Sequence, residues 1–122
     1  MAKYLVLWEV DTSRTPIDPK ERGAAWGAML DMDKQDIKDG FTKDWGSFLG
    51  ENGGYMVYEG SEMELEKKLQ RYVPFVTFKV YRVMSVEQIA ELAKGLTEGA
   101  PARGFGAIRN ENISPPMNLR NP

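Results

Sequence analysis

The chain has no cysteine and no histidine among its 122 residues. These absences exclude disulfide bonds, thiol nucleophiles, serine–histidine triads and the usual zinc sites. Proton transfer near neutral pH would therefore need a carboxylate, a lysine or a tyrosine with a shifted pKa. We expect neither a cofactor nor a metal.

The chain also lacks a large net charge of either sign, because its formal net charge is only −2. A nucleic-acid-binding protein usually presents a basic face, so we expect no nucleic-acid partner. No apolar run approaches the ~20 residues that cross a bilayer. The N-terminal stretch MAKYLVLWEV is a poor signal peptide, because its apolar run is short and is interrupted by Trp8-Glu9. We expect a cytoplasmic protein that does not associate with membranes.

Acidic residues gather in one short stretch, DMDKQD, which contains Asp31, Asp33 and Asp36. Their spacing fits a helix, and the stretch lacks the glycine of a calcium-binding loop. We therefore predict a solvated helix face at this position rather than a cation site.

Helix start and stop signals are clear at three places. Asp18 is placed to cap a helix that ends at Gly40, and Ser61 and Ser85 are placed to begin two more. β-branched and aromatic residues, which favour strands, fill the segments between the helices. We predict strands over residues 4–10, 41–50, 54–59 and 75–83, and helices within residues 18–40, 61–72 and 85–96.

The order of these elements predicts an α+β protein. A βαββαβ order is the ferredoxin-like arrangement, in which two right-handed crossovers give a four-stranded antiparallel sheet with both main helices on one face. The third helix is expected at an edge or on a partner. We assign residues 1–98 to this domain. Glycine, proline and asparagine dominate residues 99–122, which we assign to an extended C-terminal arm.

The segment GSFLGENGGYMVYEG, residues 46–60, is typical of a β-hairpin. A two-residue turn at Asn52-Gly53 would fix its register and place Leu49 opposite Met56. Apolar side chains then lie on both faces of the hairpin, and the other predicted strands repeat this pattern.

Two helices can cover only one face of such a sheet. The second face would expose roughly 600 Å² of apolar surface, as much as the largest patch on a typical monomer. Two copies joined through it would bury ~1,200 Å², the lower edge of a stable interface. We expect a sheet-to-sheet homodimer and leave higher oligomers open.

The βαββαβ order over residues 3–97, with apolar residues on both sheet faces, resembles the dimeric α/β-barrel superfamily of ferredoxin-like proteins. The stretch KDWGSFLGENGGYMVYEGS is the most distinctive and is most similar to the short uncharacterised members. The resemblance implies a dimeric barrel. The histidine used by the haem-binding and EthD-like branches is missing from this chain. No asparagine precedes Asn52, so the Asn-Trp pair common in the oxygenase branch is not matched.

Glu9 is the first candidate catalytic residue. Glu9 follows Leu5 and Leu7 at two-residue spacing, so the three residues share one mostly apolar face of the strand. Burying a carboxylate there costs free energy unless a partner compensates it. The ferredoxin-like layout brings it near Tyr55, so that Glu9 and Tyr55 together suit a proton shuttle. The alternatives are a strand end that reaches solvent, or a salt bridge from Glu9 to a basic residue.

Four aromatic residues are candidates for binding a ring-shaped ligand: Trp8, Trp26, Trp45 and Tyr58. The same spacing is typical of an ordinary core, and Trp26 lies on the apolar stripe of the first helix. Both interpretations stay open at this point.

Two classes of function follow. One is a non-catalytic homo-oligomeric binding or accessory subunit whose arm docks on a larger protein partner. The other is a cofactor-independent enzyme, isomerase- or monooxygenase-like, acting on a small hydrophobic or aromatic molecule in the helix–sheet cleft. A polar group among the apolar walls of that cleft would favour the second. The candidate partner-binding residues of the arm are Phe105, Ile108, Ile113, Met117 and Leu119.

Overall fold

The computed structural model describes residues 1–99, which fall into two units that divide between Val83 and Met84. The first unit contains a sheet and two main helices. Its elements are β1 (Lys3–Val10), η1 (Thr12–Arg14), α1 (Pro19–Lys38), β2 (Thr42–Ser47), β3 (Gly53–Glu59), α2 (Glu62–Leu69), η2 (Gln70–Tyr72) and β4 (Val76–Val83). The second unit contains α3 (Val86–Gly99).

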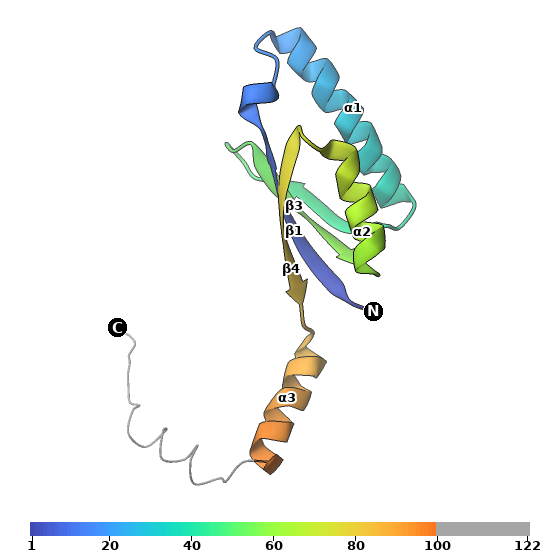
Figure 1. Ribbon diagram of the computed structural model, residues 1–122, viewed down its shortest axis with the longest axis vertical. Coiled ribbons are helices and arrows are strands. Elements are labelled where there is room, and N and C mark those ends of the chain that lie inside the picture. Colours follow the sequence, from blue (N-terminus) through green and yellow to red (C-terminus); the bar gives the residue numbers. More distant parts are fainter. Residues whose placement is uncertain (100–122) are drawn as a thin grey trace, which may run out of the picture. The chain divides into compact units, whose positions relative to one another are not determined.

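The sheet of the first unit has the strand order β2-β3-β1-β4, and every neighbouring pair is antiparallel. α1 connects β1 to β2 and α2 connects β3 to β4, and both helices lie on the same face of the sheet (Figure 1). The predicted α+β class and antiparallel sheet are confirmed. This arrangement is compatible with a ferredoxin-like fold.

The helices begin where their capping residues predict. The side chain of Asp18 accepts a hydrogen bond from the backbone N–H of Glu21 at 3.1 Å, and the Ser61 hydroxyl accepts one from the N–H of Glu64 at 3.2 Å. Each bond satisfies a backbone donor that the first turn of a helix leaves without a partner. Gly40 follows α1 with a φ of +80°, a conformation that favours glycine.

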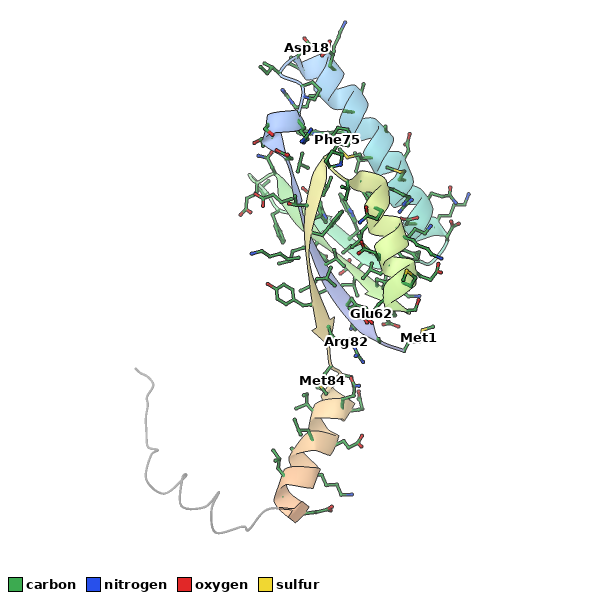
Figure 2. All side chains as sticks on the ribbon, in the orientation of Figure 1. Met1, Asp18, Glu62, Phe75, Arg82 and Met84 are labelled. Atoms are coloured by element: carbon green, nitrogen blue, oxygen red, sulfur yellow. The ribbon has the colours of Figure 1, made fainter. Side chains whose placement is uncertain are left out.

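The hydrophobic core lies between the sheet and α2, where side chains fill the space between the layers (Figure 2). Its central buried residues are Tyr4, Val6, Tyr58, Leu65 and Leu69. The ring centroids of Tyr4 and Tyr58 are 6.2 Å apart, and the Tyr58 hydroxyl donates to the carbonyl of Ser61 at 2.9 Å. Tyr58 is therefore part of the core.

The register of the β2–β3 hairpin differs from the prediction. Trp45 lies opposite Met56, and the connection between the strands is a five-residue loop over 48–52. Leu49 is in that loop and fully exposed, so the predicted two-residue turn, with Leu49 opposite Met56, is wrong. The two faces are assigned as predicted, because the register changed by an even number of residues.

Gly53, predicted as a turn residue, and Gly54, predicted as the first strand residue, both lie in β3. A side chain at Gly54 would overlap the carbonyl oxygen of Gly46 and the indole of Trp8, and a Cβ at Gly53 would come within 2.6 Å of the Trp8 carbonyl oxygen. The two glycines are therefore needed for close packing against Trp8. The local turn pattern does not predict this requirement, because Trp8 is distant in the sequence.

The second unit begins with a reciprocal cap. The backbone N–H of Ser85 donates to the Gln88 side chain at 2.8 Å, and the N–H of Gln88 donates to the Ser85 hydroxyl at 3.1 Å. Among residues 1–99, no helix combines the length and apolarity that a membrane crossing needs. The predicted arm with its partner-binding residues Phe105, Ile108, Ile113, Met117 and Leu119 lies outside the described residues.

Candidate functional site

A cavity of about 270 Å³ opens between α1 and the face of the sheet that the helices cover. Its volume exceeds the ~150 Å³ of a cavity that holds benzene, and it lies near the lower end of the ~300–1,000 Å³ range of small-molecule sites. The space therefore suits a ligand of one or two rings. Most of its walls are apolar, and they come from α1, from all four strands and from η2 with the end of α2.

All three tryptophans of the chain line this cavity, which we call the tryptophan cavity. The rings of Trp8 and Trp45 are stacked, with centroids 5.6 Å apart and planes 19° apart. The indole N–H of Trp8 donates to the carbonyl of Tyr55 at 3.3 Å, which fixes the ring orientation. Trp26 comes from α1. The structure thus brings together three of the four predicted ligand-binding aromatics, while Tyr58 lies in the core.

One hydrogen-bonded polar pair lies in the apolar wall. The hydroxyl of Tyr72, in η2, donates to Oδ1 of Asp33, in α1, at 2.7 Å. Burial raises the pKa of the half-buried Asp33 carboxyl, and the hydrogen bond from Tyr72 lowers it in part. Burial, followed by the bond to Asp33, raises the pKa of the Tyr72 phenol, which stays protonated at neutral pH. The pair offers a ligand a carboxylate in apolar surroundings.

The neighbouring Asp36 links α1 to α2 and η2 through ion pairs. Asp36 is only 4% exposed and forms ion pairs with Lys68 Nζ at 3.4 Å and with the guanidinium of Arg71. The predicted solvated helix face is therefore wrong for Asp33 and Asp36, although it is right for Asp31, which is exposed.

The sequence did contain a signal for this burial. Asp33 and Asp36 follow Met29 by four and seven residues, so the helical period places them on the apolar stripe. The acidic composition of the segment indicates a solvated face, whereas its spacing indicates burial. The partner of Asp33 lies 39 residues further along the chain, and no local pattern identifies it.

The two predicted catalytic residues lie on the other face of the sheet. Glu9 is opposite Gly53 of β3, and Tyr55 is opposite Leu7, so the two residues are neighbours on that face, as the layout predicts. Glu9 is exposed, and the Tyr55 hydroxyl donates to Asp44 Oδ2 at 3.0 Å. The sheet separates both from the tryptophan cavity. Their catalytic role stays a prediction.

The helix-free face of the sheet, which we call the open face, has an apolar centre. Leu5 of β1 lies between Val57 of β3 and Tyr81 of β4, and Leu7 lies next to Tyr55 in the adjoining row. Tyr81 is 51% exposed. Charged side chains of both signs lie around this centre: Lys3, Glu9, Glu59 and Lys79.

Comparison with protein-family models finds none that matches the chain, and a search of curated proteins likewise finds no match. Within residues 1–99, no group of three or more acidic side chains is arranged to hold a metal ion.

Proposed function

We propose that the protein binds a small, largely hydrophobic aromatic molecule in the tryptophan cavity. The observation that carries the proposal is a cavity with three indole rings in its apolar walls and one carboxylate–phenol pair, Asp33 and Tyr72. Small-molecule sites typically combine an apolar lining with a few polar groups that fix the orientation of the ligand. Titratable groups with shifted pKa values are also concentrated at functional sites.

The polar pair favours a cleft-binding function over a purely structural subunit. An enzymatic role, isomerase- or monooxygenase-like, extends the same proposal, because a carboxyl group with a raised pKa can accept or donate a proton nearer to neutral pH. In that case Asp33 replaces Glu9 as the candidate acid or base, since Asp33 lines the cavity and Glu9 does not.

A cavity-filling substitution tests the binding site. Met29 lines the cavity, whereas Met63 of α2 is exposed and lies outside it, so Met29→Trp and Met63→Trp make the same chemical change in two places. Isothermal titration calorimetry with 2-naphthol and 2-phenylethanol measures binding to each protein. We expect wild type and Met63→Trp to bind alike and Met29→Trp to lose binding. Equal binding by both variants would contradict the proposed site.

We also propose that the open face joins two copies of the chain into a homodimer. An apolar centre with a charged rim is the usual anatomy of a protein interface. The two copies can pair through the same surface, because the rim carries both signs of charge. The predicted burial of ~1,200 Å² by two copies is near the lower limit for a stable complex.

Val57→Asp tests this assembly, because Val57 lies at the apolar centre of the open face. Ile17→Asp is the matched control, since Ile17 is 92% exposed in the loop before α1. Size-exclusion chromatography with light scattering should give a dimer for wild type and Ile17→Asp, and a monomer for Val57→Asp. A monomeric wild-type protein at micromolar concentration would rule out the dimer.

A further inference from the structure

We infer that the tryptophan cavity selects a small organic cation, an aromatic ammonium compound, over neutral and anionic molecules of the same shape. The inference rests on the proposed binding function and names the class of ligand. Three independent features of the cavity point in this direction: the signs of the charges in its walls, the faces of its indole rings, and the incomplete hydrogen bonding of its buried carboxylate.

The charged side chains that line the cavity are both acidic. Asp33 lies on the α1 side and Glu51 in the hairpin loop, and no lysine or arginine is among the described residues of the lining. An anionic ligand would therefore meet repulsion without a compensating cation. A cationic ligand would meet attraction from both sides.

Three basic residues contact or adjoin residues of the lining, and each has another partner. Lys68 and Arg71 pair with Asp36, and the guanidinium of Arg22 donates to the carbonyl of Ile17 at 2.9 Å. Arg71 also attracts Asp33 and lowers the pKa of its carboxyl, but this is the smallest of the four causes, and burial keeps the pKa raised.

The indole rings supply the second feature. The face of an aromatic ring is negative, and tryptophan is the strongest of the aromatic side chains in attracting a cation. Trp8 and Trp45 are stacked on each other. Trp26 contributes from α1, and the guanidinium of Arg22 lies over its ring at 5.8 Å from the centroid, which leaves the other ring face for a ligand. A cation inside the cavity therefore lies among indoles that exclude water, and the attraction is greater there than at an exposed ring.

The hydrogen bonding of Asp33 is the third feature. A carboxylate has two oxygens and about four acceptor positions. Among the described residues, the Tyr72 hydroxyl is the one side chain that donates to it, and the donor binds Oδ1. A half-buried carboxylate with a single donor is incompletely compensated for its loss of water. An ammonium group would supply both the missing donors and the opposite charge.

Three probes of nearly the same shape test the inference on the full chain: 2-phenylethylammonium, 2-phenylethanol and 3-phenylpropionate. We expect calorimetry at neutral pH to show the ammonium compound binding at least about tenfold more tightly than the alcohol, because only the ammonium group adds a charge–charge attraction to its hydrogen bond with the carboxylate. We expect no binding of the carboxylate compound. Similar affinities for the ammonium compound and the alcohol would overturn the inference.

Asp33→Asn and Asp31→Asn form a matched pair of variants. Both remove one negative charge from α1, but only Asp33 lines the cavity. The amide of Asn still accepts the hydrogen bond from Tyr72, so the shape of the wall is kept. We expect Asp33→Asn to weaken binding of the ammonium compound by at least about tenfold more than binding of the alcohol, with no effect of Asp31→Asn. Equal effects of the two variants would also overturn the inference.

The pH dependence of the wild-type protein gives a measurement that needs no variant. Asp33 faces Tyr72 and Arg71 from η2 and Asp36 from its own helix, and Glu51 is the other acid of the cavity. Binding of the ammonium compound should weaken as pH falls through the raised pKa of Asp33, because the carboxylate becomes neutral. Affinity that is constant from about pH 8 to about pH 3, a range that includes the ordinary aspartate pKa of about 3.9, would contradict the inference.

The outcomes separate the two proposals. Binding of the alcohol without preference for the ammonium compound removes the inference and leaves the proposed function. Binding of none of the three probes contradicts the proposed function and, with it, the inference.

Discussion

Gly54→Ala adds one methyl group where β3 packs against Trp8, one of the residues that line the tryptophan cavity. Gly54 lies opposite Trp8 on one side and Ser47 on the other, in the middle of the sheet. The new Cβ would overlap the carbonyl oxygen of Gly46 and the indole of Trp8. Neither obstacle can move easily, because the first is backbone and the second is a ring stacked on Trp45.

The expected loss of stability follows from these contacts. Overpacking a well-packed site costs about 1–3 kcal/mol, and the backbone obstacle places this site near 3 kcal/mol. Alanine recovers about 0.5–1 kcal/mol relative to glycine through the smaller entropy of its unfolded chain. The net loss is therefore about 2 kcal/mol, and at about 4–8 °C per kcal/mol the melting temperature should fall by about 8–16 °C.

Thermal unfolding followed by circular dichroism measures this loss, with Gly23→Ala as the matched control. Gly23 lies within α1, and a Cβ there would have nothing within 4 Å. Since alanine is favoured over glycine in a helix by about 1 kcal/mol, the control should melt about 4–8 °C higher than wild type. A Gly54→Ala protein that melts at or above the wild-type temperature would refute the packing argument.

Two further predictions concern the acidic residues of α1. Arg71→Met leaves the buried carboxylate of Asp36 with a single basic partner and should lower the free energy of unfolding, measured in urea, by about 2 kcal/mol. This is less than the ~3–5 kcal/mol lost on breaking a fully buried pair, because Arg71 is partly exposed. Arg14→Met, which breaks an exposed pair, should cost under about 1 kcal/mol, and equal effects would contradict the ranking. Tyr72→Phe removes the hydrogen bond that lowers the pKa of Asp33, so that pKa should rise further. Because the folded pKa then lies further above the unfolded value, stability should fall more steeply as pH rises through this range, and urea titrations that show an unchanged pH dependence would contradict the assignment.

The features that the sequence predicted well depend on neighbours along the chain. The caps at Asp18, Ser61 and Ser85 involve residues three positions apart, and each helix begins at the predicted residue. The apolar stripe that contains Trp26 also depends only on helical spacing, and it does face the sheet. Local hydrogen bonds and periodicity determine such features before any tertiary contact forms.

The features that the sequence did not predict depend on contacts between distant segments. The hairpin register follows from the packing of Trp8 against Gly53 and Gly54, more than forty residues away in the chain. The burial of Asp33 depends in the same way on Tyr72. In both cases the local pattern had a second, equally ordinary interpretation, and only the tertiary contact distinguishes the two.

Because all three tryptophans line one cavity, the tryptophan emission of the protein comes from a single place in the molecule. Trp26 is 40% exposed, whereas Trp8 and Trp45 are half-buried, so a small collisional quencher such as acrylamide reaches the first directly and the other two chiefly when the cavity admits it. Acrylamide quenching of the tryptophan emission of the unlabelled chain therefore measures how readily a small molecule enters the cavity, and α3 contributes no tryptophan signal.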